Sequence, residues 1–110
     1  MQINDYTMWS IDDMLSYYSS YPDLMKSVNT SYEALFLFFE RNGLLTCQVS
    51  NFQGKVVKRF IKASEITETG LLLAKGSNSA VDRWLKSKGS SKTPPDMRIL
   101  EKELNKVKTL

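Results

Sequence analysis

The sequence contains no histidine and only one cysteine, Cys47, among its 110 residues. The absence of histidine excludes Ser-His and Cys-His catalytic pairs and metal sites built on imidazole. It also removes the side chain that most often acts as a general base near neutral pH. A single cysteine excludes an internal disulfide, so a reducing, cytoplasmic location fits best. Carboxylate or lysine chemistry remains, but no spacing of those residues supports it. We therefore expect no catalytic residue, no metal site, no cofactor and no enzymatic activity.

Long apolar runs and phosphate-binding glycine patterns are also missing. No run approaches the roughly 18 apolar residues that a membrane-spanning helix needs. The first ten residues hold an acid, Asp5, but no basic residue, unlike a secretory signal. The five glycines follow no phosphate-loop spacing, and no GK[ST] occurs. We expect no membrane contact, and a hydrophobic fraction of 42% allows one globular domain over residues 1–110.

The most apolar stretch runs from Thr30 to Ile61. Thr30 followed by Glu33 has the spacing of a capping box, and Asn42-Gly43 is typical of a helix end. The apolar residues between them predict a central, buried helix. The alternative is a strand over 35–40 that pairs with 44–50, because Asn-Gly is also a strong hairpin signal.

The remaining patterns predict a mainly helical α+β domain with four to five helices and one two-stranded antiparallel β-hairpin. Two strands joined by the NFQG turn, over 45–50 and 55–62, form the predicted hairpin. The other expected segments are a helix over 11–20 capped by Ser10, helical turns over 23–28, a polar break over 27–30, a helix after Ser64 or Thr67 that Gly76-Ser-Asn78 interrupts, a flexible linker over 86–95, and a C-terminal helix over 96–108 capped by Asp96. In that last helix, Met97, Leu100, Leu104 and Val107 form a narrow apolar stripe.

The formal charge of +3 is unevenly distributed along the chain. Residues 1–54 carry two basic and six acidic residues, a net charge of −4, whereas residues 55–110 carry thirteen basic and six acidic residues, a net charge of +7. This division indicates that the two halves attract each other, or that two oppositely charged faces meet different partners. A solvated charged face on each side is the simpler interpretation.

Tyrosines and aspartates gather in the N-terminal third, and Tyr6, Trp9 and Tyr18 belong to the same cluster. Tyrosine and tryptophan are enriched in the residues that dominate protein interfaces, and nearby acids steer a basic partner. The alternative is that half of these rings are core and the rest scattered surface. The candidate partner-binding residues are Asp12, Asp13, Tyr17, Tyr21 and Asp23.

A second candidate surface is basic and comprises Lys55, Lys58, Arg59 and Lys62. Phosphate binding needs a coherent patch of cations, but the two-residue period of a strand divides these four between opposite faces. A solvated edge strand protected by lysine is the competing interpretation. Cys47 alternates with Leu45 and Val49, which favours a small buried apolar side chain over a nucleophile.

The segments SYEALFLFFERNGLL, NFQG, SEITETGLLL and DRWLKSK, followed by ILEKELNKV, resemble in their order the small immunity proteins of bacterial contact-dependent and other polymorphic toxin systems. The resemblance covers residues 30–107 as a segment pattern without an invariant motif, so it assigns no residue. It implies a cytoplasmic antitoxin that neutralises one cognate toxin domain by binding it. Many such proteins meet nuclease toxins through acidic surfaces, which only the N-terminal half offers here.

We therefore predict that this protein inhibits a toxin domain that is itself a nuclease, by covering the active cleft or the substrate path of the toxin. The alternative is a small nucleic-acid-binding regulator that uses the basic C-terminal half. The identity of the partner and the oligomeric state are left open.

Overall fold

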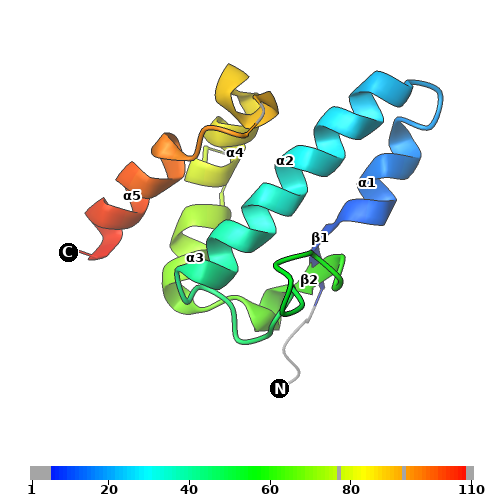
Figure 1. Ribbon diagram of the computed structural model, residues 1–110. Coiled ribbons are helices and arrows are strands. Elements are labelled where there is room, and N and C mark those ends of the chain that lie inside the picture. Colours follow the sequence, from blue (N-terminus) through cyan, green and yellow to red (C-terminus); the bar gives the residue numbers. More distant parts are fainter. Residues whose placement is uncertain (1–5, 77, 93, 109–110) are drawn as a thin grey trace.

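The computed structural model describes residues 6–76, 78–92 and 94–108. The described residues form five α-helices and one two-stranded antiparallel sheet, which confirms a mainly helical α+β fold. The α-helices are α1 (Ile11–Tyr17), α2 (Pro22–Arg41), α3 (Glu68–Ala74), α4 (Ala80–Lys86) and α5 (Arg98–Lys108), the strands are β1 (Thr7–Ser10) and β2 (Phe60–Lys62), and the short 3-10 helices are η1 (Ala63–Glu65) and η2 (Lys88–Ser91). In Figure 1, α2 crosses the molecule between α1 on one side and α4 and α5 on the other.

Helix α2 is the central element, but it begins earlier than the sequence predicts. Pro22 stands at its first position, where a backbone N–H would have no partner within the helix, so its absence in proline costs nothing. Thr30 lies inside the helix, and its Oγ1 donates to the carbonyl of Lys26 at 3.0 Å instead of capping a helix start. Both the capping box at Thr30 and the polar break over 27–30 are therefore wrong. The side chains of Asn29 and Thr30 bond within the helix, to Glu33 and to the carbonyl of Lys26, so they do not end it.

The helix over 35–40 is confirmed, and the alternative strand is excluded. Leu35, Phe36 and Phe39 are fully buried on α2 and form the centre of the core. After Asn42, the C-terminal cap, Gly43 has φ +68°, a conformation that glycine adopts at little cost.

The sheet is not the predicted hairpin. Strand β2 pairs antiparallel with β1, with Trp9 opposite Ile61 and Ser10 opposite Phe60. Ile61 is fully buried, and the ring of Trp9 meets that of Phe39 edge-on at 5.2 Å. This pairing therefore fastens the N-terminal strand to the core.

The NFQG turn does form, but among the described residues only one isolated bridge, between Ser50 and Val56, joins the segments on its two sides. The backbone N–H groups of Val49 and Ser50 donate to the carboxylate of Glu40 on α2, at 2.6 and 3.0 Å. A helix side chain thus takes the donors that a strand partner would need. Residues 44–59 form an irregular loop attached to α2 rather than a strand pair.

Two helices begin at predicted capping residues: α1, which follows β1, and α3, which comes after β2. Ser10 and Thr67 accept the backbone N–H three residues ahead of them, at the starts of α1 and α3. The break near Gly76 separates α3 from α4, and Ser79 caps α4 in the same way. The prediction of an interruption there is confirmed as two separate helices.

The segment 86–95, for which the sequence predicts an exposed linker, contains η2 packed against α2. Ser31 on α2 is buried and donates to the carbonyl of Ser90, which is also buried, at 2.5 Å. Beyond it, α5 begins at Arg98 rather than at residue 96, with Asp96 accepting the Arg98 N–H at 3.0 Å. The predicted apolar stripe buries Leu100 and Leu104 against the core.

Candidate functional site

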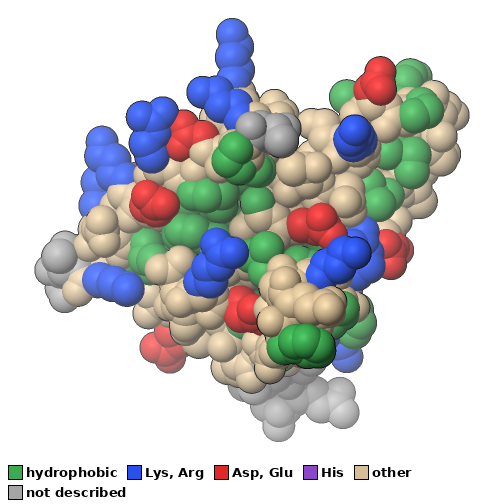
Figure 2. All heavy atoms as spheres, in the orientation of Figure 1, with side chains coloured by type: hydrophobic (Ala, Val, Ile, Leu, Met, Phe, Trp, Pro, Cys, Tyr) green, Lys and Arg blue, Asp and Glu red, His purple; other side chains and the backbone are tan. Residues whose placement is uncertain are grey.

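The α1–α2 connection carries the most exposed cluster of predicted interface residues. Tyr17 ends α1 and is 78% exposed, Tyr21 precedes α2 and is 60% exposed, and Leu24 in the first turn of α2 is 48% exposed. We call these three residues, together with Asp13 and Asp23, the α1–α2 tip. Figure 2 shows apolar side chains and an acidic one gathered at the projecting end of the molecule where α1 and α2 meet. These residues are therefore exposed although the two helices beside them are folded.

The two acids of the tip are free to face a partner. Asp13 and Asp23 stand in the first turns of α1 and α2, where the helix dipole stabilises a negative charge. Both side chains are exposed, and neither is in an ion pair with another described residue. Asp13 precedes Tyr17 by four residues, so the two lie one turn apart on the same side of α1.

Asp12, the fifth predicted residue, has a different role. Its Oδ1 lies 2.8 Å from Nε of Arg59, which also reaches Glu33 and Asn29 on α2. The structure therefore places Asp12 in a bridge between elements, and its charge is paired, unlike that of Asp13 among the described residues.

The remaining aromatic residues of the N-terminal cluster divide between core and surface. Trp9 packs on Phe36 and Phe39, so it belongs to the core. Tyr18 is half-buried beside Tyr32, and burial together with this neighbour raises the pKa of the Tyr32 hydroxyl. Tyr6 is partly exposed, but its carbonyl extends the ladder by accepting the N–H of Ala63 at 2.9 Å.

The predicted basic cluster does not form one free patch. Nζ of Lys58 lies 3.2 Å from a carboxylate oxygen of Glu65 and 3.8 Å from the centre of the Phe60 ring. Arg59 is engaged in the bridge to Asp12. Only Lys55 and Lys62 expose their charges without an ion pair to another described residue.

Cys47 is half-buried rather than fully buried, and burial raises the pKa of its thiol. The carboxylate of Glu65 raises that pKa further, because a negative charge disfavours the thiolate. A thiol held in the protonated form is a poor nucleophile.

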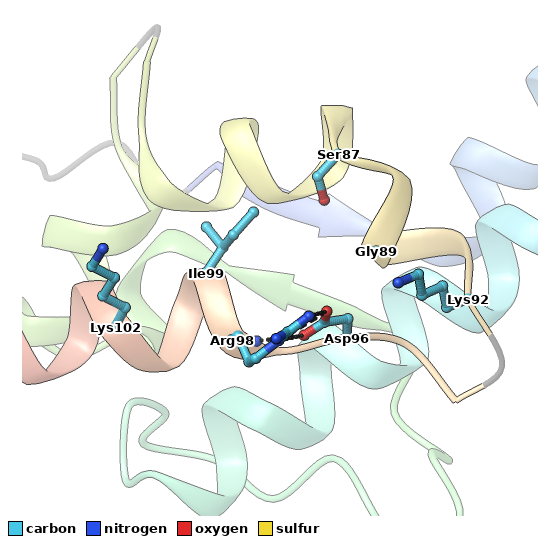
Figure 3. A pocket seen from close by; sticks show the side chains of 7 residues that line it. All are labelled: Ser87, Gly89, Lys92, Asp96, Arg98, Ile99 and Lys102. Carbon is cyan, nitrogen blue, oxygen red and sulfur yellow. Dashed lines mark hydrogen bonds and ion pairs between the residues drawn. The ribbon is translucent and has the colours of Figure 1, made fainter.

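A site that the sequence analysis missed lies between η2 and α5. Its lining includes Ser87 and Gly89 from the η2 side and Arg98, Ile99 and Lys102 from α5, around a pocket of about 340 Å³. Figure 3 shows the side chains of Lys92 and Lys102 on either side of the Asp96–Arg98 pair. We call this site the η2–α5 pocket.

The Asp96–Arg98 pair is a short, charge-neutral contact at the edge of this pocket. Nη2 of Arg98 lies 2.6 Å from Oδ2 of Asp96, and Nε donates to both carboxylate oxygens. These hydrogen bonds hold the pKa of Asp96 far below its usual range and raise the pKa of Arg98. The carboxylate therefore stays ionised and its charge is balanced within the pair.

The pocket was missed because the sequence predicts an exposed linker over 86–95. No local pattern shows that the Asp96 N–H donates to the carbonyl of Gly89 at 2.8 Å, which brings Asp96 next to η2. Gly89 is the one available signal, since a Cβ there would lie 2.9 Å from the Cβ of Asp96.

No protein-family model, curated protein or solved structure matches this chain. The described residues contain no group of three His, Cys, Asp or Glu side chains placed to hold a metal ion. Within the same residues, no helix combines the length and apolar character needed to cross a membrane.

Proposed function

We propose that this protein is a non-enzymatic inhibitor that acts as an immunity protein, binding one toxin domain through the α1–α2 tip. The supporting observation is the exposure of Tyr17, Tyr21 and Leu24 together at one end of a helix pair. Tyrosine gives a large contact area with few rotatable bonds and a polar hydroxyl, so it binds proteins at a low entropic cost.

The scaffold beneath the tip favours a preformed interface. Ser10 caps α1, Ile11 is fully buried, and α2 continues from the tip into the core over twenty residues. Two anchored helices present the tyrosines, so little ordering is needed on binding.

The charge of the tip favours a basic partner. Asp13 lies four residues before Tyr17 and Asp23 two residues after Tyr21, and neither makes an ion pair with another described residue. Enzymes that cleave nucleic acids hold phosphates with lysine and arginine. An acidic, tyrosine-bearing tip is complementary to such a cleft and would inhibit by covering it.

The experiment uses the protein encoded beside the gene for this chain, since an immunity protein is normally encoded next to its toxin. Its toxin domain is expressed alone and with wild-type protein, with Tyr17→Ser/Tyr21→Ser, or with Phe52→Ser. Phe52 is 95% exposed on the NFQG turn, so its substitution is a matched loss of an exposed ring elsewhere. We expect wild type and Phe52→Ser to restore growth and to bind, and the double tyrosine variant to do neither while its circular dichroism is unchanged.

Two outcomes contradict different parts of the proposal. If wild-type protein neither binds nor protects against the neighbouring protein, the immunity function is wrong. If the double tyrosine variant protects as well as wild type does, the function stands but the tip is not the interface.

The alternative, a nucleic-acid regulator acting through Lys55, Lys58, Arg59 and Lys62, has less support because Lys58 and Arg59 are in ion pairs. A titration of duplex DNA or RNA at rising salt tests it. Steep loss of affinity with salt would favour this function over inhibition of a protein.

A further inference from the structure

We propose that the η2–α5 pocket binds the phosphate group of a small ligand. The pocket lies in another part of the fold from the α1–α2 tip, and the inference does not depend on the proposed function. At about 340 Å³, the pocket lies at the lower end of the range of roughly 300–1,000 Å³ usual for small-molecule sites.

The wall of the pocket is held in place by the core. The carbonyl of Gly89 accepts the N–H groups of Lys92 and Asp96, at 3.2 and 2.8 Å. The carbonyl of Asp96 accepts the indole N–H of Trp84, a fully buried residue, at 2.7 Å. These contacts hold Gly89 and Asp96 together and fasten Asp96 to α4, so the shape of the pocket exists before a ligand arrives.

The charge of the pocket favours an anion with more than one negative charge. The carboxylate of Asp96 is balanced by Arg98. Lys92 and Lys102 are exposed, and neither is within ion-pair distance of a carboxylate among the described residues. Two positive charges therefore remain at a site whose only acid is neutralised.

These two lysines differ from most of the basic residues around them. Lys86 pairs with Asp82 at 3.0 Å, and Arg83 pairs with Glu103 on α5 at 3.4 Å. Part of the positive charge of the C-terminal half is thus balanced internally. A continuous cationic stripe, which a nucleic acid would need, is interrupted, while the positive charge at the pocket is retained.

The other lining groups fit a phosphate attached to a small organic group. The hydroxyl of Ser87 donates to the carbonyl of Trp84 and keeps its oxygen lone pairs as acceptors, which suits a ligand hydroxyl. Ile99 supplies an apolar surface beside the charges (Figure 3). Lysine ammonium groups bind phosphate oxygens as point charges.

The test follows the backbone amide signals of the full chain by NMR during titration at constant ionic strength. The probes are inorganic phosphate, phenyl phosphate and benzoate. We expect saturable shifts at Gly89, Lys92 and Ile99 with both phosphates and much weaker ones with benzoate. Tighter binding of phenyl phosphate than of inorganic phosphate identifies a phosphomonoester as the ligand type, and equal binding identifies free phosphate.

The variant Lys92→Gln/Lys102→Gln is expected to raise the Kd for phenyl phosphate at least tenfold. The matched control, Lys55→Gln/Lys62→Gln, removes the same charge from two other exposed lysines and should leave the Kd unchanged. Absence of saturable shifts, or an equal loss in both variants, would overturn the proposal. So would a duplex DNA oligonucleotide that binds more tightly than phenyl phosphate and is weakened equally by both variants, since that indicates general charge attraction.

Discussion

Nε of Arg59 lies 2.8 Å from Oδ1 of Asp12, joining the residue before β2 to the first turn of α1. The same guanidinium reaches Oε2 of Glu33 at 3.2 Å and the side-chain oxygen of Asn29 at 2.7 Å. One basic residue of the positive C-terminal half thus contacts two acids of the negative N-terminal half. For these residues, the uneven charge distribution in the sequence corresponds to attraction within the fold.

Arg59→Met should lower the free energy of unfolding by about 1–2 kcal/mol, because the planar guanidinium bonds to three side chains at once and methionine keeps only its apolar stem. The partial exposure of Asp12 keeps this value modest. Urea denaturation measures it.

Arg59→Lys is the matched control, since it keeps the charge without the branched donor geometry. We expect an intermediate loss of stability. An unchanged urea midpoint for Arg59→Met would show that the bridge to Asp12 and Glu33 contributes nothing to the fold.

Glu40 attaches the irregular loop to α2 and should make stability depend on pH. Partial burial alone would raise the pKa of Glu40, but hydrogen bonds from Ser50 and Val49 outweigh this effect and lower the pKa below 4.5. Because the unfolded chain then binds the proton more readily, Glu40 stabilises the fold fully above pH 4.5 and loses that contribution as the pH falls through its folded pKa.

Glu40→Gln should therefore cost about 1–2 kcal/mol at pH 7, and this cost should shrink as the pH falls below 4.5 and through the folded pKa of the wild-type side chain. Thermal unfolding of both proteins at a series of pH values measures the difference. Glu65 and Glu103 also have lowered pKa values, so the comparison with wild type is needed to isolate Glu40. A cost that does not fall from pH 7 to the lowest pH of the series would contradict the charge-based contribution.

Gly70→Ala should destabilise the protein although it lies in a helix. In an exposed helix interior this change stabilises by about 0.5–1 kcal/mol. Here a Cβ would meet the carbonyl oxygen of Leu44 at 2.9 Å and Cγ2 of Ile66 at 2.7 Å. Since the N–H of Thr67 holds that carbonyl at 2.9 Å, we expect a loss of about 1–3 kcal/mol.

Thr69→Ala, at the neighbouring position of α3, is the control and should change the melting temperature little. A higher melting temperature for Gly70→Ala than for wild type would show that Leu44 and Ile66 can move aside.

The parts of the fold that depend on local chemistry could be predicted from the sequence. Ser10 and Thr67 are predicted caps, and each side chain needs only an N–H three residues ahead. Gly43 ends α2 through a backbone conformation that the sequence also indicates.

The errors concern contacts between distant segments. Thr30 resembles a helix start, but the packing of Ser31 against Ser90 keeps α2 continuous there. The NFQG turn predicts a hairpin, but Glu40 takes the donors of Val49 and Ser50, and β2 pairs with β1 instead. No local pattern contains either partner.

The candidate sites divide in the same way. Tyr17 and Tyr21 are exposed, as residues of an interface must be, whereas the ion pair of Asp12 depends on Arg59, forty-seven residues away. The η2–α5 pocket exists only because the segment after α4 folds back onto Trp84, and its linker-like composition gives no sign of that.

Charge reversal at the tip should slow association with the partner without disturbing the fold. Asp13→Lys/Asp23→Lys changes two exposed acids that make no ion pair with another described residue, so we expect the association rate at low salt to fall about tenfold or more. The effect should shrink at high salt, because exposed charges are screened. Glu68→Lys/Glu101→Lys is a matched control, since these exposed acids also stand in the first turns of helices and the charge change is equal. Stopped-flow measurements with the toxin domain encoded beside this gene give the association rates of the two variants. Equal slowing by both would show that the net charge of the protein, rather than the tip, steers the encounter.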